Sequence, residues 1–432
     1  MKIALISLGC PKNQTDLEYL AGDLKNDGIE FTDNIGDADA VVVNTCGFIE
    51  PAVNEAIENI LMVSKEKRAD AKLIVTGCMV ERYKNEFSNE FPEVDFFTGV
   101  GTLYKVREYL ENKNTHKAKR EFYGSNRMLL NTPYYAYLKI SEGCNNNCSY
   151  CTIPSIRGRL VSRNTDEILR EAENLVKNNA KELIIISQDT TKYGIDIYGK
   201  PKIKELLKSI SKISGDFKIR LLYLNPDGIN KDFIDFVFNN EKILNYFEVP
   251  IQHFSDKILK LMNRKSDSNK IKEVFEYIRS KNDFSIIRTT AIVGFPGETE
   301  EDFLKLLDFI EQYKPDFAGF FPYYKEEGTK AANMKDMPSK KAIRNRLSRL
   351  KKAQKKNTMQ TLKNLKKGLI DCYVEKSNDD FEFILEGRAA FQAPEIDGKA
   401  FFIDGHADKG AGPYKCKIKR IVYPDIYCQI VK

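Results

Sequence analysis

Three cysteines stand close together near the middle of the chain, at Cys144, Cys148 and Cys151. Cysteine thiolates are the usual ligands of four-iron iron–sulfur clusters, which generally take four of them. Because only three are gathered here, one iron would have no protein thiolate and could bind a small molecule, as a catalytic metal site requires. A zinc site is the alternative, but zinc favours paired C-x2-C units, and no partner pair lies nearby. The spacing therefore predicts a 4Fe–4S cluster with an open iron.

A second set of cysteines, Cys10, Cys46 and Cys78, is spread through the N-terminal third of the chain. Each follows a run of apolar, branched residues that predicts a buried parallel strand. The carboxyl ends of such strands meet at one edge of the sheet, where ligands bind in open α/β folds. A single cysteine at a strand end is more often a small buried hydrophobe. Three at equivalent positions predict a second, equally open cluster.

Alternating strands and helices are predicted through the first 125 residues. The predicted strands cover 2–9, 38–45, 71–77 and 93–100, and the predicted helices cover 16–24, 52–62 and 80–87. A polar stretch at 112–131 predicts a linker. Six further strands follow, at 134–141, 181–187, 217–224, 245–251, 284–294 and 316–324. Strands separated by helices over this length predict a partial (β/α) barrel, whose active site lies in the loops after its strands.

The C-terminal part changes character twice. Residues 340–367 contain twelve Lys or Arg and no acid, and their apolar positions predict one long basic helix. Most of its charge is expected to form a solvated face. Five short strands with alternating polarity then predict a small closed β-barrel of OB-like type over 369–432. Cys372, Cys416 and Cys428 lie within these strands, and we interpret them as packing residues.

Composition limits the setting in which the protein works. With 432 residues, 42% hydrophobic and 30% charged, the chain predicts a globular protein of two or three domains. No apolar run approaches the roughly 20 residues that cross a bilayer, and the start lacks a signal-peptide cleavage site. Nine cysteines without an export signal favour metal binding in a reducing cytoplasm over disulfides. We therefore expect a cytoplasmic protein with no membrane partner.

The run EGCNNNCSYC resembles the motif of the radical S-adenosylmethionine (SAM) enzymes, and the whole chain resembles their methylthiotransferases. The resemblance implies an N-terminal methylthiotransferase domain with the auxiliary 4Fe–4S cluster at 1–125 and a radical SAM core barrel at 132–335. It also implies a basic connecting helix at 336–368 and a TRAM-like β-barrel at 369–432. SAM would then serve twice, as the methyl donor and as the source of a 5′-deoxyadenosyl radical.

Several segments resemble the branch of that family that modifies an aspartate on ribosomal small-subunit protein 12, among them SLGCPKN, QDTTKYGID and GRAAFQAPEIDG. This resemblance implies methylthiolation of the aspartate β-carbon, and an electron donor such as flavodoxin or ferredoxin. The alternatives are 2-methylthiolation of an N6-isopentenyl- or threonylcarbamoyl-adenosine in tRNA, and a non-catalytic iron–sulfur RNA-binding protein. Residues 371–432 hold nine basic and eleven acidic residues, a net of −2, which suits a basic protein partner better than RNA.

The resemblance also implies contacts outside the two cysteine sets. SAM contacts are implied at Ser187, Gln188 and Asp189, and at Gly294, Gly297 and Glu298 in GFPGE. The GFPGE segment is also a plausible strand–turn–helix junction in which Thr299 caps the next helix. Arg157 and Arg163 could neutralise a cluster, bind the SAM carboxylate or be surface charges. His253 is expected to be a structural histidine, with a substrate role left open.

Overall fold

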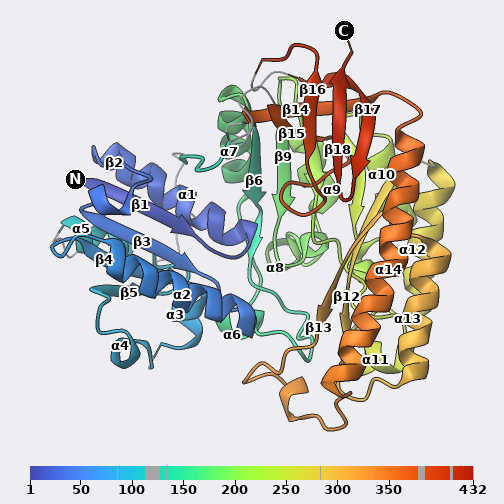
Figure 1. Ribbon diagram of the computed structural model, residues 1–432, viewed down its shortest axis with the longest axis horizontal. Helices are drawn as coiled ribbons and strands as arrows, with labels where there is room; N and C mark the ends of the chain where they lie inside the picture. The colour runs from blue at the N-terminus through green and yellow to red at the C-terminus, as the bar shows by residue number, and fades with distance from the viewer. Residues whose placement is uncertain are drawn as a thin grey trace.

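The computed structural model describes residues 1–84, 86–111, 127–132, 134–282, 284–377, 385–408 and 412–431. Residues 112–126 of the predicted linker lie outside these ranges. An N-terminal sheet, a larger central sheet and a C-terminal barrel are packed together, with a long helix along the central sheet (Figure 1). This arrangement confirms the predicted α/β class with a closed β-barrel at the end. None of the described helices is long and apolar enough to cross a membrane.

The N-terminal sheet has five parallel strands in the order β2-β1-β3-β4-β5. Its strands are β1 (Lys2–Ser7), β2 (Glu30–Phe31), β3 (Ala40–Thr45), β4 (Lys72–Gly77) and β5 (Phe96–Thr98). Helices α1 (Pro11–Asn26) and α5 (Tyr104–Glu111) cover one face, and α2 (Glu50–Glu66) covers the other. The helix predicted over 80–87 was wrong, because α3 (Cys78–Arg82) and α4 (Phe87–Glu90) are separate there. The two-residue strand β2 is too short to show a period and was not predicted.

The central sheet has six parallel strands in chain order, and it stays open as a partial barrel. The strands are β6 (Tyr135–Lys139), β9 (Glu182–Ile186), β10 (Lys218–Leu221), β11 (Ile243–Glu248), β12 (Ile286–Val293) and β13 (Phe317–Pro322). The outer helices are α7 (Thr165–Lys177), α9 (Ile203–Ser211), α10 (Lys231–Phe238), α12 (Ser268–Lys281) and α13 (Glu300–Tyr313). Shorter elements are β7 (Ser141–Glu142), α6 (Ile153–Ile156), β8 (Val161–Ser162), α8 (Ile195–Tyr198) and α11 (Asp256–Leu261).

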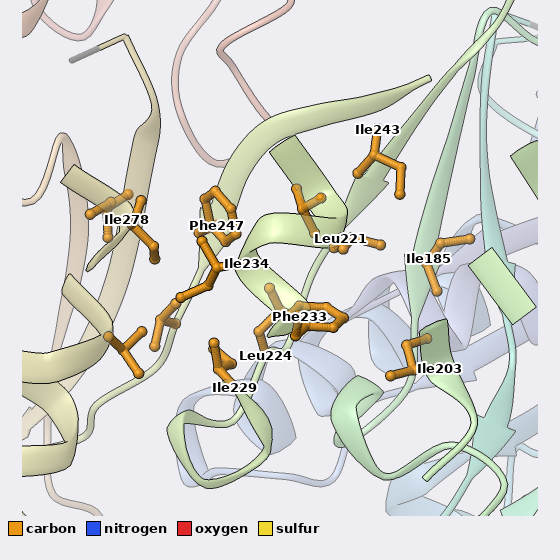
Figure 2. Close-up of a cluster of buried hydrophobic side chains, with 14 of the residues drawn as sticks. Ile185, Ile203, Leu221, Leu224, Ile229, Phe233, Ile234, Ile243, Phe247 and Ile278 are labelled. Carbon is orange, nitrogen blue, oxygen red and sulfur yellow. The ribbon is translucent and has the colours of Figure 1, made fainter. Parts of the chain in front are cut away.

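Alternation along the central strands divides their side chains between two cores. On β9, Leu183 and Ile185 pack against the outer helices, whereas Ile184 and Ile186 belong to the core shared with the C-terminal barrel. Figure 2 shows the outer core, where Phe233 and Ile234 of α10 lie among strand residues such as Ile185. Both faces of these strands are therefore buried, which explains their nearly continuous apolar runs.

Helix α14 (Lys340–Leu365) contacts α13 and β13, and most of its basic side chains are exposed as predicted. Arg346 is the exception to note, because it is 5% exposed and forms an ion pair with Glu298. The strands β14 (Ile370–Ser377), β15 (Leu385–Ala389), β16 (Ala400–Asp404), β17 (Tyr414–Val422) and β18 (Asp425–Ile430) then close into a barrel. Its core includes the fully buried Cys372, Cys416 and Cys428, as expected of packing residues.

Buried charges join this barrel to the central sheet. Glu182 on β9 accepts hydrogen bonds from Arg220 of β10 and from Arg388 of β15, each at 2.6 Å. All three side chains are 3% exposed or less. Asp397 of the barrel pairs in the same way with Arg288 of β12, at 3.0 Å. Separating the two partners of such a buried pair would leave a charge without compensation. These pairs therefore hold the barrel in one position on the sheet.

Candidate metal centres and active site

The auxiliary cysteines are brought together at one edge of the N-terminal sheet. Cys10 caps α1, Cys46 follows β3, and Cys78 begins α3, and the strands β1, β3 and β4 that precede them are direct neighbours. The loops approach closely: a Cβ on Gly9 (φ +91°) would lie 2.5 Å from the Cβ of Cys46. A Cβ on Gly47 would lie 2.8 Å from the carbonyl oxygen of Cys78. Glycine is therefore required at both positions to gather the three thiols.

Burial raises the pKa of Cys46 and of Cys78, so these two thiols are protonated when no metal is bound. Burial, followed by the neighbouring Cys10, raises the pKa of Cys46 to about 12. Burial raises the pKa of Cys78 to about 11, although the guanidinium of Arg157 opposes the shift. The thiol of Cys78 donates to the side-chain oxygen of Asn13, at 3.4 Å. Loading a cluster must therefore release protons, and the positive charge of Arg157 favours the thiolate form that binds iron.

The Cys144, Cys148 and Cys151 loop lies between β7 and α6. The amide of Asn146 points at the Cys144 sulfur, 3.4 Å away, and the guanidinium of Arg264 lies 3.9 Å from the Cys148 sulfur. Burial raises the pKa of Cys144 to about 11 and that of Cys151 to about 12. Two donors are thus already aimed at the sulfurs, which suits thiolates that carry the negative charge of a cluster.

Contacts with the end of α11 hold this loop in place. The Ser149 hydroxyl donates to the carbonyl of Leu261 at 2.7 Å, and its amide donates to the carbonyl of Met262 at 3.0 Å. The side chain of Asn263 donates to the carbonyl of Asn147 at 2.8 Å. The loop therefore keeps its shape without secondary structure of its own.

Within the described ranges, no three His, Cys, Asp or Glu side chains are spaced to hold a single metal ion. A 4Fe–4S cluster makes a different demand, because each thiolate binds a separate iron. Each cysteine set presents three thiols, and a cationic side chain lies near each set. Arg157 lies near the set of Cys10, Cys46 and Cys78, and Arg264 lies near Cys148. The donor chemistry thus fits an iron–sulfur cluster better than a single ion.

The residues that follow β9 lie beside the loop of Cys144, Cys148 and Cys151. Asp189 accepts a hydrogen bond from Asn146 of the cysteine loop at 2.6 Å and another from Asn225 at 3.1 Å. Gln188 donates to Glu142 at 2.7 Å, and its buried Oε1 has no hydrogen-bond partner among the residues described. Ser187 is fully buried and contacts Thr190. A buried acceptor left unsatisfied suits a polar ligand, and the SAM contacts implied for Ser187, Gln188 and Asp189 remain predictions.

The GFPGE turn uses its acidic residue internally. The carboxylate of Glu298 accepts from the amide of Gly294 at 2.5 Å and from Arg346 at 2.9 Å. Gly294 (φ +80°) has no room for a side chain, since its Cβ would lie 2.5 Å from Ile343 of α14. Gly297 (φ +82°) lies beside Leu261. The turn is therefore held by α14, and the SAM contacts implied for these three residues remain predictions.

His253 is enclosed in the protein and has a neutral ring. Its side chain is fully buried, its Nδ1 accepts from the amide of Ser255 at 3.0 Å, and burial lowers its pKa to about 3. The sequence left a substrate role open, but this placement favours the structural one.

We expect His253 to make the protein sensitive to mild acid. Unfolding raises its pKa to about 6.5, so stability is fully present above that pH and falls as the pH drops toward 3, by up to about 1.4 kcal/mol per unit. Thermal unfolding of His253→Gln from pH 7.5 to 5 measures this, and the variant should lose less stability than the wild type. Parallel pH profiles would contradict the assignment.

A buried network of charges connects the two cysteine sets, and it was not predicted from the sequence as a network. Arg157 donates to Glu142 at 2.8 Å, to Asp16 of α1 at 3.1 Å and to Asn13 at 2.5 Å. Lys139 of β6 completes it with ion pairs to Asp16 and Glu142. Glu142 in turn accepts a hydrogen bond from Gln188, which follows β9. The network therefore runs from the auxiliary cysteines to the residues near Cys144 and fixes α1 on the central sheet.

Arg163, the other arginine considered for this role, lies elsewhere. It donates to Glu171 of α7 at 2.6 Å and to Tyr19 of α1 at 3.0 Å, and Arg127 joins the same group. Of these two arginines, Arg157 lies near a cysteine set, whereas Arg163 strengthens the contact between α1 and the central sheet.

Two solved radical SAM enzymes are similar to this chain in fold. The radical S-adenosylmethionine methyltransferase TsrM from Kitasatospora setae matches with a TM-score of 0.55 and 14% identity, over 74% of this chain and 72% of that one. The cobalamin-dependent S-adenosylmethionine radical enzyme OxsB matches with a TM-score of 0.50 and 10% identity, over 81% and 56%. At these identities the likeness concerns the fold alone.

Sequence comparisons are more specific. Residues 138–310 match the Radical SAM superfamily, and residues 2–99 match Uncharacterized protein family UPF0004. Ribosomal protein uS12 methylthiotransferase RimO of Aquifex aeolicus is 42% identical over 99% of this chain and 96% of its own length. The protein of that name from Dictyoglomus thermophilum is 44% identical over 92% of each chain. The chain therefore belongs to the ribosomal protein uS12 methylthiotransferase family, radical SAM transferases that use SAM and carry two 4Fe–4S clusters.

Proposed function

We propose that this protein attaches a methylthio group to the β-carbon of an aspartate in ribosomal small-subunit protein uS12. The observation that supports this most is the identity of about 40% with relatives of that name over nearly their whole length. The match extends through the C-terminal segment, and the net charge of −2 over residues 371–432 favours a basic protein partner over RNA.

The two cysteine sets would divide the chemistry. Cys144, Cys148 and Cys151 would hold the cluster that cleaves SAM, and Cys10, Cys46 and Cys78 would hold the cluster that provides sulfur. When bound, the clusters and SAM supply a 5′-deoxyadenosyl radical and a methylthio group. Arg264 and Arg157 lie beside the respective sets and balance negative charge.

Other residues would position the cofactor and exclude water. Gln188 and Asp189 are proposed SAM contacts, since they lie against the cysteine loop, with the buried Ser187 supporting them. Gly294, Gly297 and Glu298 are the proposed SAM contacts in the turn that follows β12. We also propose that the segments 1–125, 132–335, 336–368 and 369–432 act as the four functional units of the chain.

The proposed substrate and reaction indicate the cellular compartment and the electron donor. A ribosomal protein is made and assembled in the cytoplasm, so we propose that the enzyme works there. Radical formation from SAM consumes an electron, and we propose a donor of the flavodoxin or ferredoxin kind.

The test is mass spectrometry of protein uS12 and of total tRNA from cells with and without this gene. Loss of a methylthio group from the uS12 aspartate alone, restored by the gene on a plasmid, would support the proposal. Loss from a tRNA adenosine with uS12 unchanged would contradict it and favour the tRNA alternative.

A further inference from the structure

Lys12 is a buried cation without an ionic partner. It lies in the first turn of α1, directly after Cys10 and Pro11, and is 6% exposed. Its ammonium nitrogen lies 3.3 Å from the centre of the Tyr223 ring. Across the part of the chain that the structure describes, it has no hydrogen-bond acceptor and no carboxylate within 4.0 Å. The contrast is Lys139, which is equally buried and pairs with both Asp16 and Glu142.

An unpaired buried charge is costly, so a lysine in this position calls for a partner. The groups that favour the charged form of Lys12 are, in order, Cys10, Glu142 and Glu248; Cys10 is one of the three thiols of the auxiliary set, and both carboxylates are already engaged. Glu142 is bound by Arg157 and Lys139, and Glu248 accepts from the backbone amide of Tyr223 at 2.5 Å. A cation–π contact with one ring replaces only part of the lost hydration. The fold therefore reserves the ammonium for a group that is not part of this chain.

Tyr223 provides a second, independent sign of a built site. It follows β10 with a φ of +60°, a backbone conformation that is rare for a bulky residue and tends to occur at functional sites. The backbone is held there by Glu248 on one side and by the amide of Thr190, which donates to the Tyr223 carbonyl at 3.1 Å. Tyr223 and Cys10 are both half-buried, so the place where they meet Lys12 keeps access to solvent.

We propose that Lys12 binds the side-chain carboxylate of the substrate aspartate, with the ring of Tyr223 as the floor of the site. The inference rests on the proposed function, which makes an aspartate the target. The β-carbon of aspartate is bonded directly to its carboxylate, so an ion pair to Lys12 fixes the reacting carbon. Because Lys12 is two residues from Cys10, the carbon is held beside the auxiliary set that would provide sulfur. Lys12 is thus a positioning and specificity-determining residue.

A binding cycle tests the proposal with the reconstituted enzyme under anaerobic conditions. The probes are unmodified uS12 and its variant in which the target aspartate is asparagine, and calorimetry measures their dissociation constants. We expect the wild-type enzyme to bind the aspartate form at least about tenfold more tightly, as a charge-assisted contact allows. Lys12→Met should bind both forms equally, at the wild-type affinity for the asparagine form. Lys25→Met, an exposed position on the same helix, should keep the full discrimination and controls for lost charge.

The competing explanation is that Lys12 only balances the charge of the auxiliary cluster. In that case Lys12→Met would still distinguish aspartate from asparagine by the wild-type factor, while the reduction potential of the cluster would change, and the proposal would be overturned. Equal binding of both forms by the wild-type enzyme would also overturn it. That second result would leave the proposed function standing if the same preparation still methylthiolates uS12. Absence of methylthiolated uS12 would mean that the proposed function itself has failed.

Discussion

Replacing Cys148 by alanine is expected to abolish cleavage of SAM to 5′-deoxyadenosine, whereas Cys46→Ala is expected to keep that cleavage and lose methylthio transfer. The two cysteines belong to sets on different sheets, one after the first central strand and one after β3 of the N-terminal sheet. Removing one of only three thiolates leaves too few ligands to hold a cluster. The losses should therefore be separable and close to complete.

Chromatography of 5′-deoxyadenosine and mass spectrometry of uS12 measure the two activities, and iron analysis reports cluster content. Cys416→Ala is the matched control, because it removes a buried thiol from the C-terminal barrel and should leave iron and both activities unchanged. SAM cleavage at the wild-type rate in Cys148→Ala would disprove the assignment of that set. Full methylthio transfer with full iron content in Cys46→Ala would disprove the other.

Arg157→Leu is expected to cause the largest loss of stability of any single substitution considered. Arg157 is 1% exposed and bonds to both Glu142 and Asp16, so its removal leaves two buried carboxylates that share the single positive charge of Lys139. Breaking a buried ion network in this way costs about 3–5 kcal/mol. The N-terminal sheet should also separate more easily from the central sheet, because Asp16 belongs to α1.

Urea unfolding of the metal-free protein measures this loss, with the first transition as the quantity to compare. Arg68→Leu breaks the exposed pair with Asp39 and should leave that transition in place. Burial would raise the pKa of Glu142, but Arg157 and Lys139 hold it well below its usual value of 4.5. The stabilisation is thus present above about pH 4.5 and is lost in acid, so the two curves should converge there. A midpoint within error of the wild type at pH 7 would show that the network is dispensable.

Strands and helices with a regular pattern of apolar residues could be predicted from the sequence. The site residues that directly follow those strands could be placed for the same reason. The apolar runs at 38–45 and 181–187 are long and branched, and both became buried strands that end beside candidate site residues. Cys46 and Ser187 could be placed at sheet edges for that reason alone. The five strands of the tail alternate in polarity, which is the pattern of a sheet with one buried face.

Contacts between distant segments leave no such period. Asn13, Asp16, Lys139, Glu142 and Arg157 meet only after the N-terminal and central units have packed together, and each alone resembles a surface residue. Arg346 was assigned to a solvated basic face, yet its burial against Glu298 decides how the GFPGE turn is held. The φ of Tyr223 and the isolation of Lys12 are likewise tertiary properties. The spacing of residues in the sequence could therefore not predict the positioning residues of the site.

The closing strand of the C-terminal barrel has a consequence for biosynthesis. β18 ends at Ile430 and lies between β16 and β17, so the barrel cannot close until the ribosome has translated the codon of Ile430. Until the barrel closes, Arg388 and Asp397 are not held against the central sheet, and Tyr137, Ile184 and Tyr246 lack the barrel side chains that complete their core. Domains fold from the N-terminus during synthesis. A prematurely terminated chain would therefore carry a formed but uncovered central sheet, a natural target for chaperones and proteases.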